Sequence, residues 1–205
     1  MYAGIFIAVA AILYVRCDNP VVAAILFSVG LLSCLIYQAP LCTGRAHRPW
    51  HEFYMPYTKS MPRIYCWMRE QSDWLLLYVI NCWFALWFGC CARLCIDVDK
   101  AVDIVQTKIS HPWYWILFMG LLCGVLIQCG VHAFNQRREY WPIVVICVTA
   151  FLMLGAEHCV ADAAFVGMCL GRDCCGHEFG FGVVKLIGLS GLGNLLAGAM
   201  FCKLH

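Results

Sequence analysis

The chain has 205 residues, of which 63% are hydrophobic and 13% charged, and its formal net charge is +2. A single soluble core of this length could not bury so much apolar surface, so the composition excludes an ordinary soluble enzyme. The small net charge gives no indication of a nucleic-acid partner. The apolar residues occur in long uncharged runs, and about 20 such residues span a bilayer as a helix. We therefore expect an all-α integral membrane protein whose surface contacts lipid.

Six apolar runs are expected to cross the membrane. In chain order they cover residues 2–15, 21–39, 74–92, 113–134, 141–161 and 183–204. The first run lacks a basic leader and a small-residue cleavage site, so it is interpreted as a span and not as a removed signal peptide. Residues 45–72 are too charged to face lipid, although residues 46–57 could form a half-span. Residues 97–110 alternate in the manner of an amphipathic or solvated connector.

Three of these runs contain sequence that interrupts a helix. The second run ends at Pro40, followed by Leu-Cys-Thr-Gly, and the sixth contains Gly-Leu-Gly-Asn at residues 191–194. The fifth run contains Glu157 and His158. We therefore expect interruptions near the membrane midplane in helices 2 and 6 and at the end of helix 5.

An internal repeat relates residues 1–95 to residues 111–205. Each half has a helix, an interrupted helix and then a helix that carries an asparagine, Asn81 in the first half and Asn194 in the second. Three spans per half is an odd number, so the halves insert with opposite orientation, a plan in which broken helices hold a site near the midplane. We predict one transmembrane channel domain over residues 1–205, with two inverted three-helix repeats in an aquaporin-like arrangement.

Loop charges predict how this domain is oriented. Basic residues in short loops stay on the cytoplasmic side. Arg45, Arg48, Lys59, Arg63 and Arg69 follow the second run, Arg137 and Arg138 follow the fourth, and Lys203 lies at the end of the sixth. In the other loops, acidic residues dilute the basic ones. We expect a multi-pass protein of the cell membrane with both termini in the cytoplasm, which requires an even number of crossings.

The two ionisable residues of the fifth run, Glu157 and His158, lie among apolar neighbours. A carboxylate in lipid costs roughly 2.5–3.5 kcal/mol, so such groups usually face a bundle interior or a water cavity. Histidine exchanges protons near neutral pH because its unperturbed pKa is about 6.5. We interpret His158 as a pore residue. The alternative is a histidine that a neighbouring helix satisfies by hydrogen bonding.

Cysteine and histidine indicate a second class of function. Most of the 16 cysteines lie inside the apolar runs, where they behave as small hydrophobic residues. Four residues in and beside a glycine-rich loop resemble a metal-ligand cluster: Cys169, Cys174, Cys175 and His177. Their spacing matches no regular zinc pattern, so neither a metal nor another cofactor is expected. A membrane redox or metal-binding protein that uses the cysteines or His111, His132 and His158 is the alternative function, and a non-transporting scaffold is a third.

Three segments resemble signatures of the formate/nitrite transporter family. Residues 27–45 end in Leu-Cys-Thr-Gly-Arg, where the family has Leu-Phe-Thr-Gly-Asn. Residues 151–162 are similar to its Gly-Phe-Glu-His-x-Val-Ala-Asn, and residues 193–198 to its Gly-Asn-x-x-Gly-Gly. The segments stand in the family's order and spacing, so the resemblance covers essentially the whole chain. It implies a homopentamer of six-span protomers, each with its own pore for formate, nitrite, hydrosulfide, lactate or a similar small monovalent anion.

The resemblance also implies roles for individual residues. Five would contribute to the substrate pore: His158, Thr43, Asn194, Glu157 and Gly124. His158 would be the central histidine, placed against Thr43. Four residues would form the cytoplasmic constriction: Phe27, Leu31, Leu41 and Cys42. Ile127 and Phe151 would form the outer constriction, and Lys108 would be the vestibule lysine.

The physics of such a pore predicts proton coupling. A formate-sized anion cannot cross two dry apolar rings as a charge, whereas its neutral acid can. We expect a basic vestibule to attract the anion and His158 to supply or relay a proton to it. Thr43 and the backbone amides at the broken helix ends would hold the anion.

Four positions depart from the family's pattern. Cys42 replaces an aromatic residue, and Gly124 stands where the family has an asparagine beside the histidine. Arg45 and Asp162 each replace a loop asparagine. We hypothesise that Arg45 and Asp162 form a compensating ion pair, because an isolated charge at that depth is costly. The alternative is that both side chains are hydrated.

Overall fold

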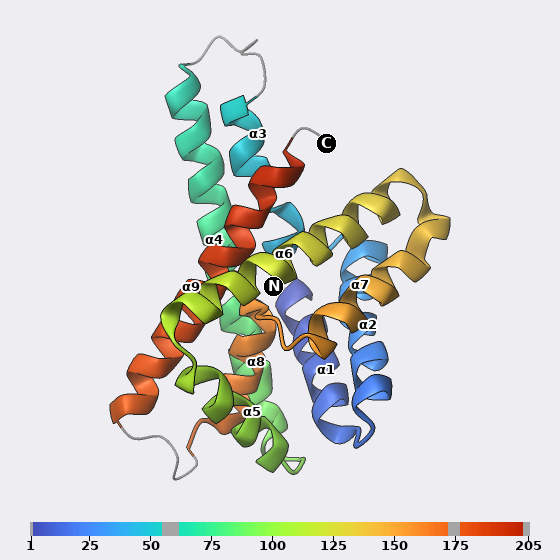
Figure 1. Ribbon diagram of the computed structural model, residues 1–205, viewed down its shortest axis with the longest axis vertical. Coiled ribbons are helices and arrows are strands. Elements are labelled where there is room, and N and C mark those ends of the chain that lie inside the picture. Colours follow the sequence, from blue (N-terminus) through green and yellow to red (C-terminus); the bar gives the residue numbers. More distant parts are fainter. Residues whose placement is uncertain (1, 55–61, 172–176, 203–205) are drawn as a thin grey trace.

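The computed structural model describes residues 2–54, 62–171 and 177–202. In chain order the elements are α1 (Tyr2–Arg16), α2 (Pro20–Ile36), the 3-10 turn η1 (Thr43–Arg45), α3 (Arg48–Tyr54), α4 (Arg63–Ala92), α5 (Asp99–Ser110), α6 (Trp113–Gln136), the 3-10 turn η2 (Arg138–Tyr140), α7 (Trp141–Met153), α8 (Cys159–Cys169) and α9 (His177–Phe201). Every regular element of the described residues is helical (Figure 1), which confirms the predicted all-α class.

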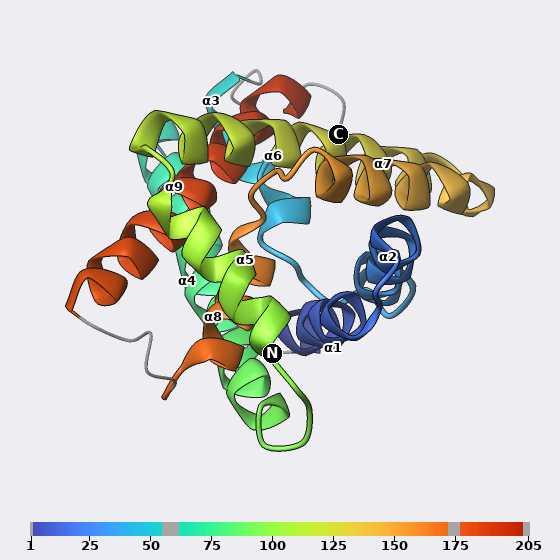
Figure 2. The same ribbon diagram turned by 60° about the horizontal axis from the view of Figure 1, so that its bottom comes forward.

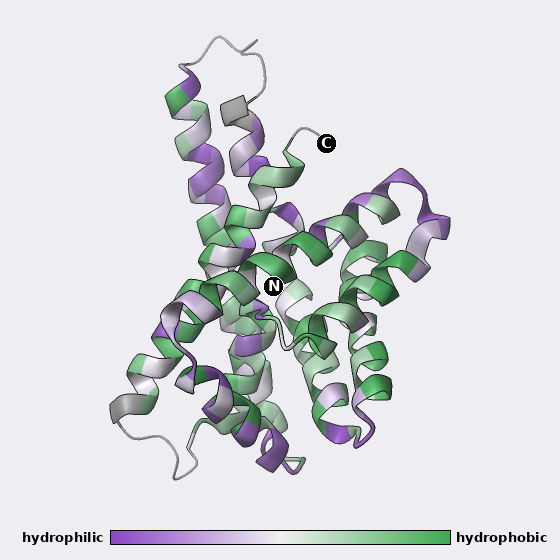
Figure 3. Cartoon of the chain, in the orientation of Figure 1, coloured by the Kyte–Doolittle hydropathy of each residue, from purple (hydrophilic) through white to green (hydrophobic). Residues whose placement is uncertain are grey.

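Three helices are long and apolar enough to cross a membrane, judged by length and composition: α4, α6 and the part of α9 at Phe179–Phe201. The helices α1, α2 and α8 are apolar and shorter. Figure 3 shows hydrophobic residues along the middle of the bundle and hydrophilic residues at the upper end of α4, at the link between α6 and α7, and at the lower end of α5. A bilayer favours this distribution, with an apolar band between two polar ends.

The helices α1 and α2 form a hairpin with a polar turn. The Asn19 side chain accepts hydrogen bonds from the backbone N–H groups of Val21 and Val22, at 3.0 and 3.1 Å. These bonds satisfy backbone donors that the start of α2 would otherwise leave free. Gly30 brings α2 close to α1, because a Cβ at this position would lie 2.7 Å from Ala10 Cβ. Small residues at such crossings allow membrane helices to approach closely.

The predicted interruption of the sixth run at residues 191–194 is wrong, because α9 is continuous over His177–Phe201. Its glycines serve helix packing instead. A Cβ on Gly193 would lie 2.5 Å from the Leu117 carbonyl oxygen of α6, and a Cβ on Gly124 of α6 would lie 2.6 Å from Ala197 Cβ. With no proline in this segment the helical hydrogen bonds persist, and the glycines let the backbones of α6 and α9 meet.

The predicted breaks in the second and fifth runs are present. After α2 ends, Gln38 takes a left-handed conformation with φ of 53°, and η1 begins at Thr43. After α7 ends, Gly155 has φ of 67°, and His158 stands at the N-cap of α8. Figure 2 shows the two breaks close together in the centre of the bundle.

An asparagine on α4 holds the first break. Asn81 is fully buried and accepts a hydrogen bond from the Cys42 N–H at 2.9 Å. Its amide nitrogen donates to the Pro40 carbonyl oxygen at 3.3 Å. One side chain therefore bonds two backbone groups that the end of α2 leaves outside a helix.

An asparagine on α9 holds the second break in the same way. Asn194 is fully buried and accepts a hydrogen bond from the Cys159 N–H at 3.1 Å. Its amide nitrogen donates to the carbonyl oxygens of Glu157 and Gly120, at 3.0 and 2.7 Å. Asn81 and Asn194 therefore make equivalent contacts at the two breaks.

We predict that Asn194→Ala lowers the stability of the folded protein. The substitution leaves the buried Cys159 N–H without a partner, and an unsatisfied buried polar group costs about 1–3 kcal/mol. Thermal unfolding in detergent micelles, followed by circular dichroism, measures the loss. Asn135→Ala is the matched control because Asn135 is exposed. Equal melting temperatures for the two variants would show that Asn194 does not hold the break.

Candidate functional site

The two breaks meet at a hydrogen bond between Thr43 and His158. Thr43 Oγ1 lies 3.1 Å from His158 Nε2, and both residues are buried. His158 Nδ1 accepts the backbone N–H of Ala161 at 3.1 Å and so caps the start of α8. Because Nδ1 is an acceptor, the neutral ring carries its hydrogen on Nε2 and donates it to Thr43.

A buried glutamine of α6 extends this polar group. Gln128 Nε2 donates to the Thr43 carbonyl oxygen at 2.5 Å, and Gln128 Oε1 lies 3.2 Å from His47 Nδ1. Sequence reasoning overlooked Gln128, although an amide inside the apolar run 113–134 is a signal that could have found it. Gly124, the predicted pore residue one turn earlier on α6, packs against Asn194 and Ala197 of α9.

Aromatic rings lie against His158. Phe151 stacks on the imidazole with ring centroids 5.9 Å apart, and Phe27 meets Phe151 edge to face at 6.0 Å. The prediction that Phe27 and Phe151 belong to opposite constrictions is therefore wrong. Phe27 precedes Leu31 by four residues on α2, which is about 6 Å along a helix axis, so these two residues lie at different depths.

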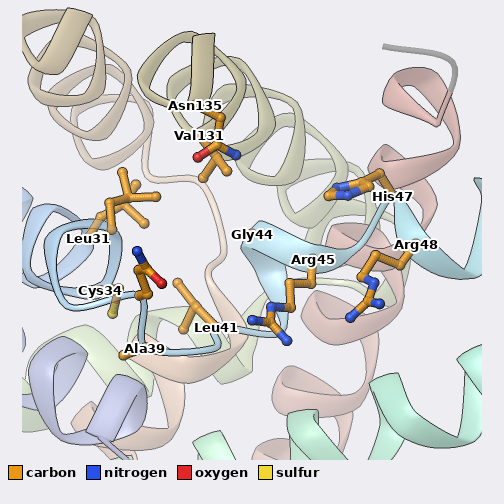
Figure 4. A pocket seen from close by; sticks show the side chains of 12 residues that line it. Leu31, Cys34, Ala39, Leu41, Gly44, Arg45, His47, Arg48, Val131 and Asn135 are labelled. Atoms are coloured by element: carbon orange, nitrogen blue, oxygen red, sulfur yellow. The ribbon is translucent and has the colours of Figure 1, made fainter. Parts of the chain in front are cut away.

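A pocket of about 400 Å³ opens at the η1 side of the breaks. Leu31 and Leu41 contribute apolar lining, while Arg45, His47 and Arg48 contribute basic groups (Figure 4). Both arginines are exposed, so their charges are hydrated. We call this cavity the arginine pocket.

Two other residues predicted for the constrictions, Cys42 and Ile127, are buried. The backbone of Cys42 is fixed on both sides: its N–H donates to Asn81, and its carbonyl oxygen accepts the Trp74 Nε1–H at 2.8 Å. Ile127 precedes Gln128 on α6 and belongs to the apolar core.

On the other side of His158, two carboxylates converge on one lysine. Lys108 of α5 contacts the Glu157 carboxylate, and its Nζ lies 3.0 Å from Asp162 Oδ1. Glu157 and Asp162 are 0% and 1% exposed. The hypothesis that Arg45 pairs with Asp162 is therefore wrong. The connector helix α5 folds back onto α8 and supplies Lys108, while Arg45 stays in the arginine pocket. We call Lys108, Glu157 and Asp162 the ionic cluster.

A cavity of about 60 Å³ joins the ionic cluster to His158. Lys108, Asp162, His158 and Phe151 are among the residues that line it. Burial lowers the pKa of Lys108, but the neighbouring Asp162 and Glu157 carboxylates raise it more, so it lies above the ordinary lysine value. The cavity therefore has a fixed ammonium group at its wall.

Two further lysines fasten α5 to the bundle. Lys100 Nζ donates to two backbone carbonyl oxygens at the α1 side of the α1–α2 turn, at 3.1 and 2.6 Å. Lys185 Nζ of α9 donates to two carbonyl oxygens at the end of α5, each at 2.8 Å. The place of Lys108 therefore depends on contacts at both ends of its helix.

The three histidines of the alternative redox or metal-binding function contact different residues. His111 stacks on a tryptophan, His132 contacts a glutamine, and His158 bonds a threonine. In the part of the chain that the structure describes, no three His, Cys, Asp or Glu residues form a metal-ligand group. Cys174 and Cys175 of the predicted loop cluster lie outside the described residues.

The fold and the site define a helical membrane protein in which two broken helices meet at a buried histidine, with a cavity on each side of the contact. The chain belongs to the formate/nitrite transporter family, whose sequence profile matches residues 1–205. The resemblance predicted from the three motifs is thus confirmed.

Individual relatives agree with this assignment. The formate channel FocA of Escherichia coli strain K12 is 25% identical over 187 residues, which cover 81% of this chain and 63% of the relative. The formate channel FocA of Escherichia coli O157:H7 matches with the same values. The chain therefore spans 63% of the length of the curated relatives it matches.

Two solved structures share the fold. A pentameric formate channel with formate bound superimposes with a TM-score of 0.77 at 20% identity, over 98% of this chain and 91% of its own. An FNT family ion channel superimposes with a TM-score of 0.75 at 19% identity, over 99% of this chain and 83% of its own.

We predict that Lys108→Gln destabilises the protein, because the buried carboxylates of Glu157 and Asp162 lose the ammonium group between them. Breaking a buried ion pair costs about 3–5 kcal/mol, so Lys108→Gln should unfold at a lower temperature than Arg16→Gln, which removes an exposed cation. Adding Glu157→Gln and Asp162→Asn should restore most of the loss, since no unpaired charge then remains. Identical unfolding temperatures for Lys108→Gln and Arg16→Gln would contradict the ionic cluster.

Proposed function

We propose that this protein is a channel that passes small monovalent anions of the formate class, or their conjugate weak acids, across the cell membrane. Its family and the names of its relatives, which are formate channels, support this function. The single observation that carries it is the buried Thr43–His158 hydrogen bond, which lies between the arginine pocket and the smaller cavity. Formate, nitrite, hydrosulfide and lactate are the candidate substrates.

The path would cross the membrane between two inverted halves. The six crossings would be α1, α2, α4, α6, the pair α7 and α8, and α9, with Asn81 and Asn194 holding the broken helices. We place the arginine pocket on the cytoplasmic side because basic loops stay there. The loop charges would put both termini in the cytoplasm in this proposal.

An apolar collar excludes bare charge from the centre of this path. Leu31 and Leu41 lie on the side of the arginine pocket, and Phe27 and Phe151 lie beside His158. These side chains offer an anion no hydrogen-bond donor, and an unpaired charge in a low-dielectric region is strongly disfavoured. The neutral acid avoids that cost, so transport of the anion together with a proton is favoured.

His158 would relay that proton. In the neutral ring Nε2–H donates to Thr43, and an anion can replace Thr43 as the acceptor. A proton taken up at Nδ1 displaces the Ala161 N–H and makes the ring an imidazolium. When the Nε2–H bond then breaks, a bond to hydrogen forms on the anion. The neutral acid leaves, and the ring is neutral again.

We further propose that the protein is a homopentamer with one pore in each protomer. The solved structure of a pentameric formate channel supports this assembly. Large apolar side chains are exposed on α2 and α4, among them Val29, Leu76 and Trp83. In a pentamer in a bilayer, such side chains would contact neighbouring protomers or lipid.

We predict that liposomes containing the purified protein take up at least one of the four candidate anions faster than empty liposomes, measured by stopped-flow light scattering. His158→Asn should lower the uptake about 100-fold, because a positioned proton-transfer group contributes a factor of that order. His132→Asn is the matched control, since this histidine of α6 contacts Gln136 of the same helix and is not among the residues that line the two cavities.

Two results would contradict different parts of this proposal. Uptake of none of the four anions by the wild-type protein would overturn the proposed function. Uptake by His158→Asn at the wild-type rate would remove His158 from the path and leave the channel function standing.

We predict that native mass spectrometry of the protein, released from a mild detergent, detects five chains in one complex. Five copies are expected because the protomer shares its fold with a pentameric channel. A complex of any other size under conditions that keep the protein folded would contradict the pentamer.

A further inference from the structure

The ionic cluster contains two carboxylates and one ammonium group. Lys108 contacts both Glu157 and Asp162, whose side chains are buried. Glu157 Oε1 and Asp162 Oδ2 have no hydrogen-bond partner within the described residues. If both carboxylates were ionised, this buried site would carry an excess negative charge and two bare oxygen atoms.

No second cation faces the cluster from the described parts of the neighbouring helices. The other titratable groups around it come from α1, α4, the end of α5, α6 and the start of α8: Tyr14, Tyr78, Cys82, His111, Cys123 and His158. Burial and the neighbouring lysines lower the pKa of His111, which favours its neutral form. The ring of His158 is neutral, because its Nδ1 accepts the Ala161 N–H. From α9, Asn194 is bonded to backbone groups and Lys185 to carbonyl oxygens of α5.

Binding of one proton would remove the excess negative charge of the ionic cluster. An unpaired charge in a low-dielectric region is strongly disfavoured, and a carboxylate there neutralises by taking a proton. A protonated carboxyl group also becomes a hydrogen-bond donor, which its ionised neighbour can accept. Two close acids that share a proton titrate as one coupled unit.

The position of Asp162 gives such a proton access to the cavity. Asp162 and His158 both line the cavity of about 60 Å³, and Phe151 closes part of its wall. An anion that enters this cavity therefore meets Asp162 beside the collar. The family has an asparagine where this chain has Asp162, and an asparagine cannot hold an acidic proton.

We propose that Glu157 and Asp162 share one exchangeable proton beside Lys108, and that Asp162 gives it to a small anion entering from this side. The inference rests on the proposed function and assigns a proton donor to this end of the path, while His158 serves the end of the same path at the arginine pocket. The O–H bond of Asp162 breaks as a bond to hydrogen forms on the anion. The products are the neutral acid and a second carboxylate, which Lys108 stabilises until water returns a proton.

Infrared spectroscopy tests the shared proton without any transport. At neutral pH the purified wild-type protein should show the carbonyl stretch of a protonated carboxyl group. Asp162→Asn and Glu157→Gln should each lack this band, because Lys108 then balances one carboxylate. Asp103→Asn removes an exposed carboxylate of α5 and should keep the band. A wild-type spectrum without the band, or a band that persists in Asp162→Asn, would overturn the proposal.

Uptake into oriented membrane vesicles tests the delivery of the proton. At neutral pH, Asp162→Asn should slow formate uptake about tenfold or more in vesicles of either orientation, because a group that speeds entry of the anion also speeds its exit along the same path. Acidification of the medium should bring the uptake rate of the variant back to the wild-type rate, because formic acid then enters already protonated. Uptake by Asp162→Asn at the wild-type rate, or slow uptake that acidification does not restore, would overturn the role of Asp162. Wild-type vesicles that pass no candidate anion would instead overturn the proposed function. The infrared test of the shared proton does not depend on that result.

Discussion

A helix that breaks inside a membrane frees backbone groups that lipid cannot bond, and the rest of this structure depends on how that constraint is met. Asn81 bonds the backbone beside Thr43, and Asn194 bonds the backbone beside His158. Since each asparagine belongs to a continuous helix, the breaks are held by the most regular parts of the bundle. The Thr43–His158 contact can therefore be polar in surroundings that are otherwise apolar.

Charge is distributed unequally on the two sides of that contact. The arginines of the arginine pocket are exposed, so they act on an approaching anion through water. Lys108 is surrounded by Glu157 and Asp162, which offset its charge. In the proposed channel, one entrance would therefore attract anions through excess positive charge, and the other would offer an anion a balanced group of ions close to the aromatic rings.

The sequence predicted the breaks at Pro40 and at Glu157 and His158, because these residues are difficult to place within a lipid-facing helix. The break predicted at the glycines of residues 191–194 is wrong, since a glycine in the sequence is compatible both with a break and with a close helix contact. Only the position of α6 decides between the two, and that position is a tertiary property. The family was predictable for a different reason, because its motifs coincide with the residues around both breaks.

The partners of charged residues were harder to predict. Asp162 and Arg45 both depart from the family's pattern, which suggests that they pair, but the path of α5 brings Lys108 to Asp162. A connector of mixed polarity gives no indication of where it will dock. The family's pattern indicates position 124 on α6 and gives no indication that Gln128, one turn later, bonds the Thr43 backbone.

The attachment of α5 by Lys100 and Lys185 has an evolutionary consequence. The ammonium group beside His158 is carried by a connector, while the spanning helices form the scaffold that fixes the breaks. Substitutions on α5 can thus change the electrostatic character of one mouth without repacking the bundle. Related proteins could diversify in what they admit while inheriting the same framework.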